Sequence, residues 1–100
     1  MKLRVITRPG PAFMEMILAR IPASERQDLQ EMRYGAAGLC HGNLLDLFWA
    51  ADIVEKACTC HPVLVQGSCP QHIQMLAFFG KQSEVAAGAG ALKAAMEANA

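Results

Sequence analysis

The apolar and polar positions divide the first third of the chain into short elements. Residues 3–7 alternate before a Pro-Gly-Pro turn at 9–11, and an apolar run follows over residues 13–21. These two segments predict two strands joined by a short loop. Residues 24–33 are polar with acidic residues early, which predicts a short surface helix with Ser24 as its cap.

The middle of the chain predicts a strand over residues 36–40 and then a helix over residues 44–58. Asn43, with Asp46 three residues further on, resembles a capping box at the start of that helix. Apolar residues then recur at helical spacing, which predicts that they form the buried face. These residues are Leu44, Leu47, Phe48, Ala51 and Val54.

Two apolar runs, 62–66 and 73–79, are bounded by glycines and predict a hairpin. No formally charged residue lies between Lys56 and Lys81, so we expect neighbouring elements to cover this hairpin. Ser83 is expected to cap a final helix over 84–98. Two glycines inside that helix, Gly88 and Gly90, lower its intrinsic propensity and indicate close packing there.

The predicted order is therefore β-β-α-β-α-β-β-α in a single α+β domain over residues 1–100. The chain has 100 residues, 53% hydrophobic, with nine basic and nine acidic side chains. Because a chain of this length and apolar content cannot hide all its apolar surface in one core, we expect it to oligomerise. The scattered basic residues argue against nucleic acid as a partner.

The start of the chain and its hydropathy predict a cytoplasmic protein. No signal-peptide pattern follows the basic residues of 1–10, and no apolar run is long enough to span a bilayer, so we expect no membrane partner. No constellation of catalytic residues or nucleotide-binding glycine loop is present either, which predicts that the protein is not an enzyme.

The turn Gly67-Ser68-Cys69-Pro70-Gln71 carries the candidate chemistry of the chain. Gly67 permits backbone angles that other residues avoid, and Pro70 fixes the next bend, so the Cys69 thiol is expected at the tip of the hairpin. A thiol displayed in this way is suited to metal binding or redox chemistry. From these residues alone it could equally be an ordinary turn cysteine.

The other cysteines leave two further interpretations open. Cys58-Thr59-Cys60-His61 and Cys40-His41 offer soft ligands for zinc, although structural zinc sites use cysteine pairs two to four residues apart. Buried structural cysteines at the end of the 44–58 helix are the alternative. A thiol redox role is also conceivable, but Cys58 and Cys60 are expected to carry opposed side chains that cannot close a disulfide comfortably.

A resemblance to a known family covers nearly the whole chain. Residues 37–42, Ala50-Ala51-Asp52-Ile53-Val54-Glu55-Lys56-Ala57, the hairpin and Phe79-Gly80-Lys81 resemble the bacterial microcompartment shell domain over 36–98. Residues 1–22 resemble the strands that circularly permuted members carry at the beginning of the domain. The Cys69 turn is similar to the motif of GrpU-type shell proteins from glycyl-radical propanediol microcompartments.

This resemblance implies a ferredoxin-like arrangement, with a four-stranded antiparallel sheet flanked by helices and an extra N-terminal strand. It implies a homohexameric shell tile in a microcompartment, with other shell proteins and encapsulated redox or glycyl-radical-associated enzymes as partners. Lys56 matches the lysine at the edge where neighbouring tiles meet, and Gly67, Ser68, Cys69, Pro70 and Gln71 match a pore motif.

In that motif the cysteine binds an iron–sulfur cluster, of 4Fe-4S type by expectation, shared between subunits for electron transfer or cluster delivery. Cyclic symmetry would gather six copies of Cys69, and a cubane cluster takes up to four thiolates, so we expect a subset of the ring to bind it. A purely structural tile and a small soluble thiol- or zinc-binding protein remain the alternatives.

Overall fold

A four-stranded sheet forms the centre of the computed structural model, which describes residues 1–31, 35–66 and 74–99. The strand order is β1-β2-β4-β3, and every neighbouring pair is antiparallel. The strands are β1 (Lys2–Thr7), β2 (Ala36–His41), β3 (His61–Gln66) and β4 (Gln74–Gly80), and the helices are α1 (Pro11–Leu18), α2 (Ala23–Glu31), α3 (Leu44–Ala57) and α4 (Gln82–Ala98).

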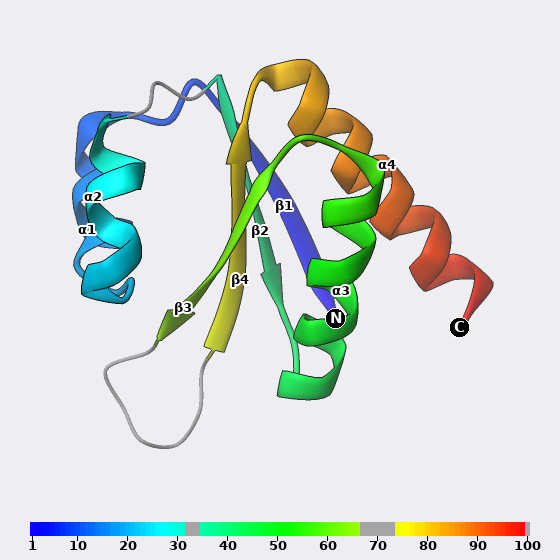
Figure 1. Ribbon diagram of the computed structural model, residues 1–100. Helices are drawn as coiled ribbons and strands as arrows, with labels where there is room; N and C mark the ends of the chain where they lie inside the picture. Colours follow the sequence, from blue (N-terminus) through cyan, green and yellow to red (C-terminus); the bar gives the residue numbers. More distant parts are fainter. Residues whose placement is uncertain (32–34, 67–73, 100) are drawn as a thin grey trace.

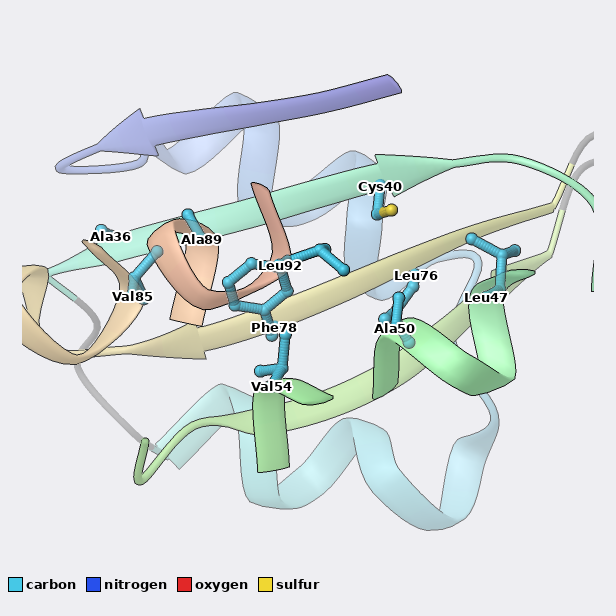
Figure 2. Close-up of a cluster of buried hydrophobic side chains, with 10 residues drawn as sticks. All are labelled: Ala36, Cys40, Leu47, Ala50, Val54, Leu76, Phe78, Val85, Ala89 and Leu92. Carbon is cyan, nitrogen blue, oxygen red and sulfur yellow. The ribbon is translucent and has the colours of Figure 1, made fainter. Parts of the chain in front are cut away.

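Helices cover both faces of the sheet, with α1 and α2 on one side and α3 and α4 on the other (Figure 1). Alternation along the strands divides the core accordingly, because successive strand side chains point to opposite faces. Figure 2 shows the α3/α4 face, where Phe78 points into the same space as Val54 and Leu92. The opposite face buries Ile17, Ile21, Ala37, Val63, Val65, Ala77 and Phe79.

The topology is that of a ferredoxin-like fold in which the strand that usually comes last in the sequence comes first. From β2 onward the chain runs strand, helix, two hairpin strands and helix, and β1 fills the remaining edge position beside β2. Appending β1 after α4 would give the β-α-β-β-α-β order of that fold. The expected four-stranded antiparallel sheet flanked by helices is thus confirmed.

The strand predicted over residues 13–21 is wrong, because the chain there is the helix α1. Pro11 occupies the first helical turn, where its missing N–H costs nothing, and the alanine, methionines, glutamate and leucine that follow are good helix formers. Phe13 and Ile17 lie one turn apart and contact the same core. The N-terminal part therefore contributes one strand, β1, to the sheet.

Two predicted helix caps are also wrong, whereas a third is confirmed. The α2 helix begins at Ala23, and the carbonyl of Pro22 accepts its first hydrogen bonds, so Ser24 lies inside the helix. Ser83 likewise lies inside α4, whose N-cap is Lys81. At α3 the Asn43 side chain accepts a 2.8 Å hydrogen bond from the backbone N–H of Asp46, as expected.

The two glycines of α4 differ in their surroundings. A Cβ atom at Gly88 would lie 2.9 Å from Cys58 Sγ, so the expected close packing is confirmed there. Nothing lies within 4 Å of the corresponding position at Gly90, for which the same expectation is wrong. Gly88 therefore lets α4 approach the end of α3.

Candidate functional site

The hairpin of β3 and β4 positions the segment that carries the Cys69 motif. The two strands pair from His61↔Phe79 to Gln66↔Gln74, so residues 67–73 connect adjacent strand ends at one end of the sheet. The predicted site residues Gly67, Ser68, Cys69, Pro70 and Gln71 lie outside the described residues. Their assignment as a cofactor site stays a prediction.

Lys56 lies in the last turn of α3 and is largely exposed, as is its partner Asp52 one turn earlier. Its Nζ lies 2.8 Å from the Asp52 carboxylate, and this hydrogen bond raises the pKa of Lys56. The lysine is therefore a cation held on the helix surface. Its predicted place at an edge between neighbouring tiles is not tested by these contacts.

The first two turns of α3 present an apolar surface to solvent. Leu45 is 78% exposed and Phe48 is 56% exposed, while the residues of the opposite side of the helix are buried. We call this surface the α3 apolar face; it consists of Leu44, Leu45, Phe48 and Trp49.

The spacing of residues 45, 49, 52 and 56 places Asp52 and Lys56 on the same side of α3 as this apolar face. One exposed helix surface thus combines large apolar groups at its beginning with an ion pair at its end. Contiguous exposed apolar residues of this kind are typical of surfaces that bind a partner.

Leu44 and Phe48 were expected in the core, and the structure corrects that expectation. The buried positions of α3 are Leu47, Ala50 and Val54, which are spaced by three and four residues. Sequence reasoning missed the α3 apolar face because it placed Leu44 and Phe48 in the buried stripe and made no assignment for Leu45 and Trp49. Leu45 and Trp49, one turn apart, form a second stripe that a single buried face cannot include, and this was the available signal.

Cys58 and Cys60 face one another, so the expectation of opposed side chains is wrong. Their Sγ atoms lie 2.8 Å apart, and both residues are partly buried. Cys58 has extended backbone angles, and residues two apart in extended chain point to the same side. Burial, followed by the hydrogen bond to Cys58, raises the pKa of Cys60 to about 12.

Cys40 lies on β2 in the α3/α4 core and is fully buried (Figure 2). Burial raises its pKa to about 11, so it is a neutral thiol that packs as a small apolar group. Among the described residues, no group of three or more His, Cys, Asp or Glu side chains could hold a metal ion. Cys58, Cys60 and His61 therefore do not form the zinc site considered as an alternative.

Comparisons with known proteins identify the fold. No family model and no curated protein matches the sequence. The structure is similar to the ligand-free GrpU microcompartment shell protein from Pectobacterium wasabiae, with a TM-score of 0.73, 26% identity, and coverage of 92% of this chain and 99% of that chain. It is also similar to the ligand-free GrpU shell protein from Clostridiales bacterium 1_7_47FAA, with a TM-score of 0.64 and 24% identity over 93% of this chain and 88% of that chain.

Both of these structural neighbours are microcompartment shell proteins, in agreement with the expectation from the sequence that the chain is not an enzyme. No helix in residues 1–31, 35–66 or 74–99 combines the length and apolar character needed to cross a membrane.

Proposed function

We propose that this chain, which shares its fold with GrpU microcompartment shell proteins, is a structural tile of a bacterial microcompartment shell. The main support for this proposal is the similarity to the Pectobacterium wasabiae shell protein, which extends over nearly the full length of both chains. The proposal places the protein in the cytoplasm, within the shell, with other shell proteins as its neighbours.

The tile is proposed to be a homohexamer in which the α3 apolar face contributes to contacts between subunits. Leu45 and Phe48 are more than half exposed in the single chain, and covering such side chains is worth about 25 cal/mol for each Å² of apolar surface removed from water. In a ring of subunits related by rotation, every chain would bury its α3 apolar face against a neighbour. The stabilisation from this burial would therefore occur at each contact of the ring.

Native mass spectrometry of the purified full-length protein tests this part of the proposal. We expect a species of six chains, and flat rings or sheets in negative-stain electron micrographs. A protein that stays monomeric at micromolar concentration contradicts the tile and favours the alternative of a small soluble thiol protein.

We further propose that Cys69 supplies the ligands of an iron–sulfur cluster shared between subunits. The donor chemistry supports sharing, because the three other cysteines of one chain are placed away from the hairpin connection or buried. Cys58 and Cys60 precede β3, whereas Cys69 follows it, and β3 is six residues long. Cys40 is fully buried.

A single chain thus offers one thiolate for the cluster, and a cubane cluster takes up to four. The residues fit such a group only when several chains contribute Cys69. A bound cluster would supply one-electron transfer, and encapsulated redox or glycyl-radical-associated enzymes would be the partners. Iron analysis of protein reconstituted under anaerobic conditions separates this tile from a purely structural one, which would retain no iron.

A further inference from the structure

The connection between α3 and β3 holds two thiols in contact, and the proposed shell function uses neither of them. Cys58 Sγ lies 2.8 Å from Cys60 Sγ and 3.3 Å from the carbonyl oxygen of Val54. A disulfide has an S–S distance of about 2.05 Å, so the two sulfurs are about 0.8 Å from bonding distance.

Three neighbouring contacts fix this pair in place. Gly88 of α4 leaves room for the Cys58 sulfur, since a Cβ atom there would lie 2.9 Å from it. Gly80, at the end of β4, lies beside Cys60, since a Cβ atom there would be 3.4 Å from that sulfur, in van der Waals contact with it. The backbone N–H of Thr59 donates a 2.7 Å hydrogen bond to the Glu84 carboxylate. The backbone between the two cysteines is therefore held with both thiols on one side.

We infer that Cys58 and Cys60 form a reversible redox site that closes to an intramolecular disulfide on reaction with a low-molecular-weight disulfide such as glutathione disulfide. Both residues are partly exposed rather than fully buried, which gives a small reagent access that the buried Cys40 lacks. The inference concerns residues away from the Cys69 motif and does not depend on the proposed shell function.

The two thiols are oxidised in two successive thiol–disulfide exchange steps. The Cys58 thiolate attacks one sulfur of glutathione disulfide and releases the first glutathione thiolate, which leaves a mixed disulfide at Cys58. Cys60 then loses its proton to solvent and attacks Cys58 Sγ, expelling the second glutathione. The two protein sulfurs together lose two electrons, and glutathione disulfide gains them as two molecules of glutathione.

We assign the second step to Cys60, whose thiol is desolvated by burial. Its pKa is raised to about 12, so this thiol stays protonated at neutral pH and is a poor entering nucleophile. Once Cys58 carries a mixed disulfide, Cys60 needs only the short movement to Cys58 Sγ. Proximity then favours formation of the Cys58–Cys60 disulfide over reaction of Cys60 with a second glutathione disulfide.

A full-length Cys69→Ser protein tests the inference, because it removes the thiol outside the described residues and leaves three cysteines. The folded protein is equilibrated with excess glutathione disulfide under anaerobic conditions, quenched with acid, denatured and alkylated. We expect alkylation at Cys40 alone, and a tryptic peptide 57–81 that has lost two hydrogen atoms, about 2 Da, and retains no glutathione.

Cys58→Ser and Cys60→Ser in the same background are the matched controls. Each keeps one thiol at the site, so neither can lose the two hydrogens, and Cys60→Ser is expected to hold a glutathione at Cys58. Alkylation of both Cys58 and Cys60 in the oxidised parent, a glutathione on each, or a disulfide that includes Cys40 would overturn the inference. Circular dichroism of each variant confirms that the readout comes from folded protein.

Discussion

The ring of Phe78 lies directly over Gly38, its partner on the neighbouring strand, where any Cβ atom would overlap the ring. Both residues are on the α3/α4 face of the sheet, and Phe78 is fully buried there. The missing side chain at Gly38 is therefore what allows Phe78, the largest residue of this core, to pack against β2.

Gly38→Ala is expected to lower the free energy of unfolding by about 3 kcal/mol, the upper part of the range for overpacked cores. Phe78 would have to leave its place between α3, α4 and the sheet, because the backbone of β2 is fixed by pairing on both sides. Urea unfolding followed by circular dichroism measures the change.

Gly90→Ala is the matched control for this substitution. The position is in the middle of α4 with nothing within 4 Å, so the added methyl group should raise the free energy of unfolding by about 1 kcal/mol through helix propensity. Equal effects of the two substitutions would contradict the role assigned to Gly38.

The hairpin and the capped start of α3 could be predicted from the sequence because local signals determine them. Asn43 before Asp46 specifies a cap, and two apolar runs around a glycine and proline turn specify paired strands. The helix α1 was missed because a short apolar run alone does not distinguish a helix from a strand. Pro11 at its start and the helix formers after it were the local signals for a helix, and packing of Ile17 against the sheet agrees with them.

The candidate site was predictable only in part for the same reason. The exposure of Leu45 and Phe48 depends on which side of α3 packs against the sheet. The sequence of the helix alone does not reveal that side. The contact between Cys58 and Cys60 depends on extended backbone angles after the helix end. A spacing of two residues permits that contact but does not reveal it without those angles.

Cys40 makes stability fall at alkaline pH. Burial raises its pKa in the folded state to about 11, above the ordinary value near 9, so the unfolded chain loses the thiol proton first as pH rises. The stabilisation is complete below pH ~9 and is lost as pH rises to ~11, with a total of about 3 kcal/mol at about 1.4 kcal/mol per pKa unit.

Urea unfolding under reducing conditions from pH ~8 to ~11 measures this dependence. Cys40→Ala should have a lower stability at pH ~8, because it leaves a small cavity, and a shallower fall across the window. Cys60 titrates in both proteins and cancels from the comparison. Parallel curves for the two proteins would refute the assignment to Cys40.

Leu45→Glu should weaken the oligomer without unfolding the chain. The side chain is 78% exposed in the single chain, so a glutamate there should change subunit stability by less than about 0.5 kcal/mol. A carboxylate in a covered apolar contact should raise the dissociation constant about tenfold or more. Sedimentation or native mass spectrometry across a dilution series measures it.

Met16→Glu is the control, since Met16 is 69% exposed but lies on α1, on the opposite side of the sheet. We expect it to assemble as the parent protein does. If both substitutions weaken the oligomer equally, the α3 apolar face has no particular role in assembly.

Lys56→Ala tests the predicted edge position separately from the ring. The pair with Asp52 is exposed, so its loss should leave the unfolding midpoint of the chain unchanged within error. We expect rings to form but their association into sheets to be lost, as measured by electron microscopy and pelleting. Lys93→Ala, on the exposed surface of α4, is the control, and sheets from both variants would exclude the edge role.

Cys69→Ser should abolish iron binding while leaving assembly intact, if the thiols of a ring share one cluster. For the parent protein reconstituted anaerobically, we expect about four iron atoms per six chains, because a single cubane cluster serves the whole ring. Its visible absorption should bleach on reduction, and the reduced form should give an electron paramagnetic resonance signal. Cys58→Ser, which changes a thiol at the far end of β3, is the matched control and should keep both signals. Iron retained by Cys69→Ser, or lost equally in the two variants, would remove the cluster from the proposed function and leave the structural tile.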